Sequence, residues 1–224
     1  LGISSHFIKI ARRLNPRMLI IMGGPNIPIE DERKIEFVKR FPKVDIYVTG
    51  EGDFLATELV KSFIAHGHAV EKMLGEDYHS CLYKKDGGSH IVTPIKPRTR
   101  ALDDIPSPWL TGVLDDFFNG QLSPLYETNR GCPFTCTFCV QGTKWYTKVN
   151  YFSLERIREE IFYIARKIKQ KSPSQKLLRL ADPNYGMYKR DVEISGYIGE
   201  TQKLYDFKLM IDATTGKNEA ERII

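Results

Sequence analysis

Residues 131–139 read Gly131-Cys132-Pro133-Phe134-Thr135-Cys136-Thr137-Phe138-Cys139 and hold three of the chain's four cysteines, in the spacing C-x3-C-x2-C. Thiolates are soft ligands for zinc and for iron–sulfur clusters, and three of them this close in sequence can bind one metal centre. A structural zinc site needs four ligands, usually in two separated pairs. Here the fourth cysteine, Cys81, lies far upstream, and no histidine follows the cysteine loop. Three thiolates therefore favour a four-iron cluster with one iron left open for a substrate or cofactor.

The same stretch resembles the signature of the radical S-adenosylmethionine (SAM) superfamily, C-x3-C-x-φ-C, with Phe138 as the aromatic residue φ. An expected strand at residues 124–128 leads into the loop, as it does in that superfamily. The resemblance implies that Cys132, Cys136 and Cys139 bind a 4Fe-4S cluster whose open iron chelates SAM. One electron from the cluster would cleave SAM to methionine and a 5′-deoxyadenosyl radical, which abstracts hydrogen from a substrate. The alternative is a zinc-stabilised, non-catalytic binding module with a Rossmann-like appendage.

The composition is that of a folded chain. It has 224 residues, of which 42% are hydrophobic and 27% are charged, enough to bury a core. It contains no signal peptide pattern and no apolar run near the roughly 18 residues of a membrane span. The grouping of the cysteines is not that of a disulfide framework, and oxygen-sensitive thiolates indicate a reducing cytoplasm. The net charge of +5 is spread along the chain, which argues against nucleic acid as a partner.

The first part of the chain alternates expected strands and helices. We expect strands at residues 18–22 and 45–49, and the end of another strand at residues 1–4. Helical spacing of apolar residues predicts helices at 6–14, 30–40 and 53–66. This order is typical of a doubly wound α/β fold with a parallel sheet, in which ligands bind beyond the carboxyl ends of the strands. The strand ends carry small residues: Ser4, Ser5, Gly23, Gly24 and Gly50.

These strand ends resemble the second half of the cobalamin-binding domain of cobalamin-dependent radical SAM enzymes. The resemblance implies that the five small residues line the cavity for the nucleotide tail of cobalamin. The third loop, Gly50-Glu51-Gly52-Asp53, ends in Asp where those families usually carry Glu. Tight turns at positive φ are an alternative reason for the glycines. Cobalamin binding therefore stays open at this point, as does its role in methyl transfer or in a rearrangement.

The middle of the chain no longer alternates expected strands and helices. Two apolar segments, at residues 80–84 and 90–94, flank the turn residues 85–89 and predict a β-hairpin. Cys81 lies in its first strand, where we expect a packed thiol. Residues 100–109 are rich in proline and predict a linker. We therefore divide the chain into a C-terminal half of a cobalamin-binding Rossmann-like domain (1–66), a hairpin and Pro-rich linker (67–123), and the N-terminal part of a radical SAM domain (124–224).

Beyond the cysteines, strand and helix signals alternate again. Ser153 is a good N-cap for a helix that ends near residue 170, and a strand (176–181), a helix (189–204) and a further strand (208–212) follow. Repeated βα units are typical of a TIM-like barrel. In the resembled superfamily the barrel has six units, of which this chain would hold two and the start of a third. We therefore expect an internal fragment of a longer protein.

Asp182 and Asn184 follow the expected strand at 176–181, where many members of the superfamily carry Gly-Gly-Glu to hold the amino group of SAM. The resemblance implies that Asp182 accepts those amino hydrogens with help from Asn184, and that Phe138 packs beside the adenine. The alternative is that Asp and Asn around a proline only form a turn. No residue is singled out as catalytic. The partners we expect are a small-molecule substrate and an electron donor such as flavodoxin or ferredoxin.

Overall fold

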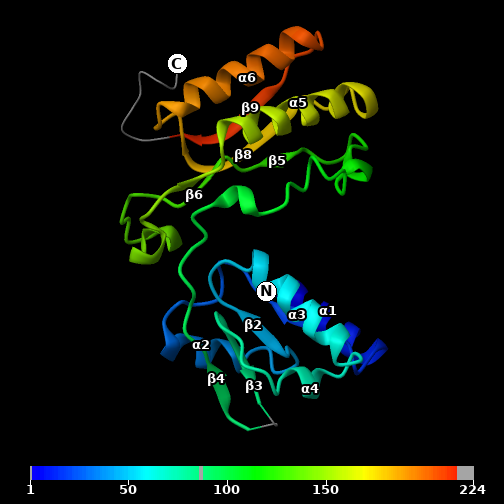
Figure 1. Cartoon of the computed structure of the whole chain (residues 1–224), viewed down its shortest axis with the longest axis vertical. Helices are drawn as coiled ribbons and strands as arrows, with labels where there is room; N and C mark the ends of the chain where they lie inside the picture. The colour runs from blue at the N-terminus through cyan, green and yellow to red at the C-terminus, as the bar shows by residue number, and fades with distance from the viewer. Residues whose placement is uncertain (1, 86–87, 216–224) are drawn as a thin grey trace. The chain divides into compact units, whose positions relative to one another are not determined.

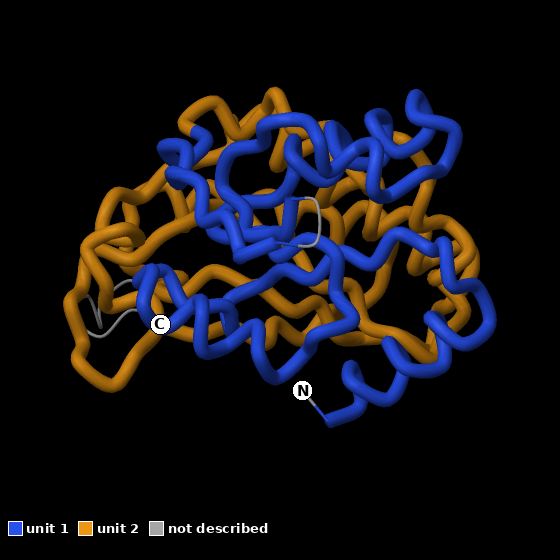
Figure 2. The backbone as a smooth tube through the Cα atoms, turned by 90° about the horizontal axis from the view of Figure 1, so that it is seen from below, with its two compact units in different colours: residues 1–99 blue, residues 100–224 orange. Residues whose placement is uncertain are grey.

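The computed structural model describes residues 2–85 and 88–215, and the chain divides into two compact units, residues 1–99 and 100–224 (Figures 1 and 2). This division differs from the expected boundaries after residues 66 and 123. The first unit takes in the hairpin, and the second takes in the Pro-rich segment. Each unit has its own sheet and its own buried cluster, so each is described by itself.

The first unit contains a four-stranded sheet in the order β1-β2-β3-β4. Strand β1 (Ile21–Met22) runs parallel to β2 (Ile46–Val48), which confirms the parallel pair. The hairpin is confirmed as β3 (Cys81–Lys84) and β4 (His90–Val92), which pair antiparallel. It does not link two domains, because β3 also pairs antiparallel with β2 and so extends the first sheet. The hairpin is predicted from a few neighbouring residues, which contain no information on the pairing of β3 with the distant strand β2.

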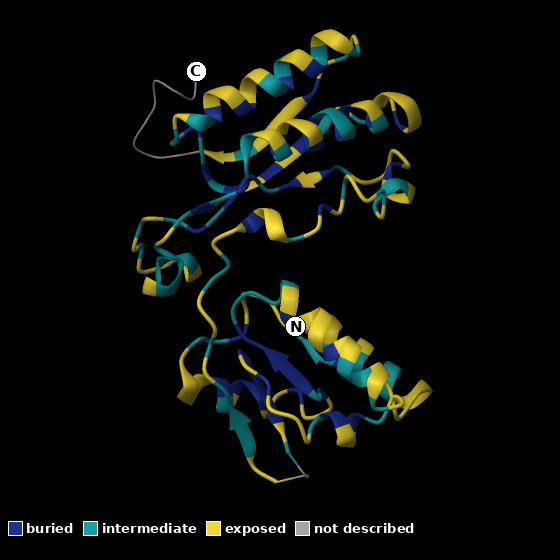
Figure 3. Ribbon diagram, in the orientation of Figure 1, coloured by how far each residue is buried: buried dark blue, intermediate teal, exposed yellow. Residues whose placement is uncertain are grey.

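Four helices cover the two faces of this sheet: α1 (Gly2–Leu14), α2 (Asp31–Val38), α3 (Asp53–Ala65) and α4 (Val70–Met73). Side chains of α1 and α2 pack with Tyr47 on one face. Side chains of α3 and α4 pack with Ile46 and Val48 on the other. Alternate residues of a strand point to opposite faces, and β2 is buried along its length (Figure 3). Helices therefore cover both faces of this sheet, in agreement with the expected α/β architecture.

The expected strand end at residues 1–4 is wrong, because Ser4 and Ser5 lie inside α1. The apolar residues Ile3, Phe7 and Ile10 continue the helical spacing of the segment 6–14 back to its start. Ile8 and Ala11 pack against the buried cluster beneath α1, which stabilises one continuous helix. No helix among the described residues is both long enough and apolar enough to cross a lipid bilayer.

The second unit is built on a parallel sheet in the order β5-β8-β9, with strands β5 (Leu125–Tyr126), β8 (Leu177–Tyr185) and β9 (Met210–Thr215). Helices α5 (Leu154–Lys171) and α6 (Arg190–Leu204) connect these strands. The Ser153 side chain caps α5 by accepting a hydrogen bond from the backbone nitrogen of Arg156 at 3.2 Å. The remaining elements are the ribbon of β6 (Asn129–Arg130) and β7 (Asn150–Tyr151), and the 3-10 turns η1 (Leu102–Asp104), η2 (Asp115–Phe117), η3 (Val140–Gly142) and η4 (Lys144–Tyr146).

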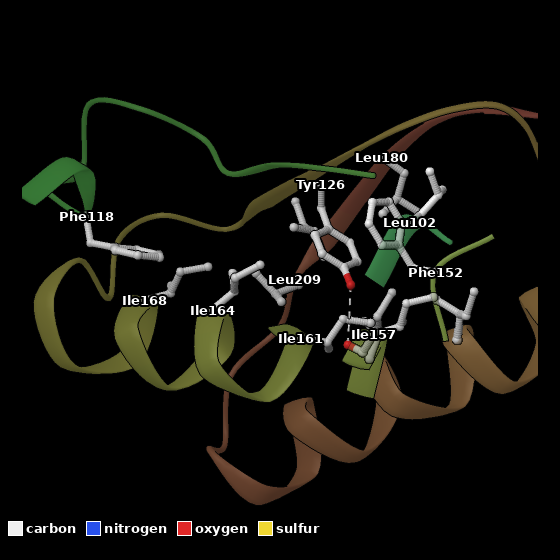
Figure 4. Packing of buried hydrophobic residues seen from close by; sticks show 13 residues of the cluster. Leu102, Phe118, Tyr126, Phe152, Ile157, Ile161, Ile164, Ile168, Leu180 and Leu209 are labelled. Atoms are coloured by element: carbon white, nitrogen blue, oxygen red, sulfur yellow. Dashed lines mark hydrogen bonds between the residues drawn. The ribbon is translucent and has the colours of Figure 1, made fainter. Parts of the chain in front are cut away.

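The core of this unit lies between the strands and the helices α5 and α6 (Figure 4). Figure 4 shows the hydroxyl of Tyr126 directed at the backbone of α5, where it lies 3.5 Å from the carbonyl oxygen of Ile157. Leu102 is 1% exposed and Phe118 is 7% exposed, and both belong to this cluster. The segment expected to be a linker therefore supplies core residues. Closely spaced prolines predict an irregular backbone, but they do not predict whether that backbone is buried.

Candidate functional site

The three cysteines lie in the loop between β6 and β7, and backbone hydrogen bonds join the two ends of this loop. Strands β6 and β7 pair antiparallel. Directly beyond them the backbone nitrogen of Cys132 donates to the carbonyl of Tyr146 at 3.0 Å. Gly131, which comes before Cys132, has a φ of +112°, a conformation that favours glycine. These features fix where the first cysteine leaves the ribbon.

The second and third cysteines are held by a tight turn. The nitrogen of Cys139 donates to the carbonyl of Cys136 at 3.1 Å, and the nitrogen of Gly142 donates to the carbonyl of Cys139 at 2.9 Å. A Cβ atom at Gly142 would lie 2.0 Å from the carbonyl oxygen of Cys136, closer than any real contact. Only glycine fits at this position. The sequence shows Gly142 near the cysteines, but only the folded loop shows why it must be glycine.

All four cysteines are free, and Cys132, Cys136 and Cys139 are at least partly accessible. Their side chains are not gathered into a finished site, since no group of three or more Cys, His, Asp or Glu residues in the described part of the chain is placed to hold a metal ion. The donor set is nevertheless three accessible thiols in one loop, which suits the thiolate-bound irons of a cluster. Phe138 lies on this loop and is 84% exposed. Cys81, in contrast, is 1% exposed, and burial raises the pKa of its thiol to about 11, which confirms the packed thiol.

Strand β8 reaches the cysteine loop through Asn184. Its side-chain nitrogen Nδ2 donates to Sγ of Cys132 at 3.2 Å, and the residue is 5% exposed. Because β8 extends to Tyr185, the alternative that Asp182 and Asn184 only form a turn is wrong. The pairing of β8 with β9 is irregular between Leu180 and Tyr185, and an irregular stretch tolerates the missing N–H of the intervening proline.

Asp182 is fully buried and serves the scaffold. Its carboxylate accepts hydrogen bonds from the backbone nitrogens of Thr128 at 2.8 Å and Asn129 at 3.3 Å, and from the hydroxyl of Thr128. Burial raises the pKa of Asp182 to about 6, against the opposing effect of these hydrogen bonds. The exposed fraction of Asp182 is 0%. A contact of Asp182 with the amino group of SAM stays a prediction.

The three glycines predicted to bind cobalamin follow neighbouring strands of the first sheet. Gly23 follows β1 and Gly50 follows β2, and these two strands are parallel neighbours. Gly24 and Gly50 have φ values of +104° and +78°, so both need glycine for their turns. Gly23 is different, because a Cβ atom there would meet Val48 at an ordinary 3.6 Å. The backbone thus explains two of the three glycines, and their role in cobalamin binding stays a prediction.

Ser4 and Ser5 lie near the start of α1, and the other end of this helix is anchored. Arg12 forms an ion pair with Asp45 at 2.8 Å, and Asp45 directly precedes β2. The carboxyl end of α1 therefore lies where β2 starts. The two serines are about two helical turns away, roughly 12 Å along the axis. Their place in a cobalamin crevice stays a prediction.

Glu51 has a role that the sequence did not indicate. Its Oε1 accepts a hydrogen bond from Nε of Arg98 at 3.0 Å, and its Oε2 accepts one from the backbone nitrogen of Thr99 at 2.7 Å. The Glu51 and Arg98 side chains are 15% and 8% exposed. Glu51 therefore ties the loop after β2 to the last residues of the first unit. The contact spans 47 positions, so no local pattern predicts it.

No family model matches the chain, but several known proteins are similar to it. It is 28% identical over 221 residues to the cobalamin-dependent radical SAM methyltransferase TokK of Streptomyces tokunonensis. It is 29% identical over 223 residues to the 2-(S-pantetheinyl)-carbapenam-3-carboxylate methyltransferase of Streptantibioticus cattleyicolor. Each alignment covers 96% of this chain and 30% of the relative, so the chain spans about a third of the length of these proteins.

A solved structure agrees in fold. The cobalamin-dependent SAM radical enzyme OxsB, with aqua-cobalamin and SAM bound, matches with a TM-score of 0.60 at 18% identity. The match covers 91% of this chain and 27% of that one. At this identity it supports the α/β architecture with a parallel sheet.

Proposed function

We propose that this chain, a homologue of the cobalamin-dependent radical SAM methyltransferases, carries the cluster-binding loop and part of the cobalamin site of such an enzyme. The observation that carries the proposal is the loop of Cys132, Cys136 and Cys139, held between β6 and β7 beside the parallel sheet of the second unit. Similarity to two methyltransferases across 96% of the chain supports it. Strands β5, β8 and β9 are then the first strands of a radical SAM barrel.

In this proposal the three cysteines bind the cluster, and the turn at Gly142 links the backbone of Cys136 to that of Cys139. When bound, the cluster supplies the electron that cleaves SAM to methionine and a 5′-deoxyadenosyl radical. The exposed ring of Phe138 supplies an apolar surface for the adenine. Asp182 acts indirectly, because it ties β8 to residues 128 and 129 just before the loop. Catalysis depends on such fixed placement of the reacting groups.

The first unit would then bind cobalamin at the carboxyl edge of β1 and β2. Residues 1–66 would form the second half of a Rossmann-like cobalamin domain, with Gly23, Gly24 and Gly50 at the crevice and Ser4 and Ser5 nearby. Ligands of parallel sheets lie at this edge, and the positions of the glycines after neighbouring parallel strands support the site. Among the reactions open to such an enzyme, methyl transfer is favoured because both relatives aligned over 96% of the chain are named methyltransferases.

The proposal also names partners. The enzyme would act on a small-molecule substrate and would need an electron donor, such as flavodoxin or ferredoxin, to reduce the cluster. All four cysteines are free, and accessible thiolates are open to oxidation, so we propose a reducing cytoplasm as the place of action.

The proposal is tested on the whole enzyme that carries this chain, by incubating it anaerobically with SAM and dithionite and measuring the release of 5′-deoxyadenosine. We expect the wild type and a Cys81→Ser variant to release it, because the Cys81 thiol is packed in the core of the first unit. A Cys139→Ala variant should release none. Release by the Cys139→Ala variant at the wild-type rate would refute the proposal.

A further inference from the structure

Two side chains of β8 hold the segment that leads into the cysteine loop. Asp182 accepts hydrogen bonds from residues 128 and 129, and Asn184 donates one to Cys132. Residues i and i+2 of a strand point to the same side, so both side chains leave β8 toward this segment. The first contact fixes the backbone just before Cys132, and the second reaches the sulfur itself.

The contact at Cys132 is well defined. The distance from Nδ2 of Asn184 to Sγ of Cys132 is 3.2 Å, well within the range for a hydrogen bond to sulfur, and Asn184 is 5% exposed. Water therefore competes little for the amide. Nδ2 is the donor end of the amide, so its contact with Sγ leaves the acceptor Oδ1 unused. An amide also does not ionise, so it remains a donor at every pH at which the protein is folded.

A hydrogen bond to a thiolate ligand has a predictable effect on a cluster. Reduction adds negative charge to the cluster and its sulfurs, and a donor at sulfur stabilises the more negative state. Hydrogen bonds to sulfur are among the factors that set the reduction potential of such clusters. Residues beyond the direct ligands act on a metal centre in this way, by orienting a ligand and tuning its electronics.

We infer that Asn184 is a positioning residue that hydrogen-bonds the Cys132 thiolate and raises the reduction potential of the cluster. This inference rests on the proposed function, since it needs a cluster bound by Cys132. It gives Asn184 a role through the cysteine ligand and not through contact with SAM.

The reduction potential of the reconstituted cluster tests this role directly. We expect EPR-monitored redox titration to give a more negative potential for Asn184→Ala than for the wild type. A tenfold smaller equilibrium constant for one-electron reduction corresponds to a shift of about 59 mV, and we expect a change of about this size. Asn184→Asp should shift the potential further in the same direction, because it keeps the side-chain size but places a negative charge beside the sulfur. Asn119→Ala is the matched control, because Asn119 is an exposed asparagine in the same unit, and its potential should equal that of the wild type.

A second measurement does not depend on the stability of the variants. Protein labelled with 15N-asparagine should show a weak coupling between the reduced cluster and one asparagine nitrogen in pulsed EPR. The coupling should persist in Asn119→Ala and vanish in whichever Asn184 variant retains a cluster. Wild-type protein that binds no iron would refute the proposed function and this inference with it. A wild-type cluster without the 15N coupling, or with potentials unchanged in the Asn184 variants, would overturn this inference alone.

Discussion

The carboxylate of Asp182 accepts a hydrogen bond from the backbone nitrogen of Thr128 at 2.8 Å, across 54 positions of sequence. The contact joins β8 to the segment between β5 and β6, and the carboxylate is fully buried. Burial raises the pKa of Asp182 to about 6, whereas an aspartate in an unfolded chain titrates near 3.9. Folding therefore favours the protonated form of this side chain.

This raised pKa predicts a pH dependence of stability. The stabilisation from protonated Asp182 is fully present below about pH 4 and is lost as the pH rises through about 6. Between pH 4 and 7 the wild type should lose on the order of 2 kcal/mol of unfolding free energy relative to Asp182→Asn, whose side chain does not titrate. Urea unfolding at several pH values, followed by tryptophan fluorescence, measures this difference. Both tryptophans, Trp109 and Trp145, lie in the second unit. If the unfolding free energies of the two proteins changed with pH in parallel, the raised pKa of Asp182 would be contradicted.

A buried ion pair in the second unit gives a second prediction. Glu160 is 3% exposed and accepts hydrogen bonds from the Tyr126 hydroxyl at 2.9 Å and from Nε of Arg156 at 3.0 Å. Nη1 of Arg156 in turn donates to the carbonyl of Ile105 at 2.5 Å, which holds the Pro-rich segment on α5. Glu160→Gln leaves the charge of Arg156 without its partner, and we expect a loss of about 3 kcal/mol in unfolding free energy.

The matched control for this substitution is Glu200→Gln. Glu200 pairs with Arg158 at 3.2 Å, but both side chains are more than half exposed. Exposed pairs contribute little, so denaturant unfolding should show a change of less than about 0.5 kcal/mol. Equal losses in the two variants would mean that burial of the Glu160 pair does not matter.

The cobalamin edge of the first unit is tested by a valine at Gly24. A Cβ atom at Gly24 would meet nothing within 4 Å, so a larger side chain would project into open space at the edge where we place the cofactor. Gly24→Val should abolish cobalamin binding by the protein, measured by absorbance of the protein-bound cofactor after gel filtration. The φ of +104° also makes any side chain strained there, so the variant needs a control for lost stability.

Gly67→Val is that control. Gly67 also has a positive φ, +63°, with open space around it. It follows the carboxyl end of α3, a helix of 13 residues and roughly 20 Å that starts just after β2. Gly67→Val should therefore bear backbone strain but retain cobalamin. If both variants bind cobalamin as well as the wild type does, Gly24 only forms a turn.

Local signals in the sequence predicted most of the elements. The cap at Ser153, the helical stripe of α5 and the apolar run before Gly23 each depend on neighbours within a few residues. The start of α1 was predicted wrongly: the helix includes Ser4, where we expected the end of a strand. Periodicity over only a few residues cannot fix where a helix starts, and tertiary packing decides it.

The site depends on contacts that a sequence does not display. The cysteine spacing identifies the candidate ligands, but Asn184 meets Cys132 only because β8 lies beside the ribbon that carries the loop. Glu51 binds Arg98 for a similar reason, since the hairpin folds back on β2. The burial of Asp182 was also hidden, because a carboxylate is usually exposed unless it has partners. Each of these contacts spans more than forty positions.

The central claim is that three cysteines of one loop bind a 4Fe-4S cluster while the fourth is structural. Anaerobic reconstitution followed by iron and acid-labile sulfide analysis tests it most directly. We expect about four irons and four sulfides per chain in the wild type and in Cys81→Ser, and loss of both in Cys136→Ala. Bound zinc in place of iron, or the same iron content in Cys136→Ala and Cys81→Ser, would contradict it.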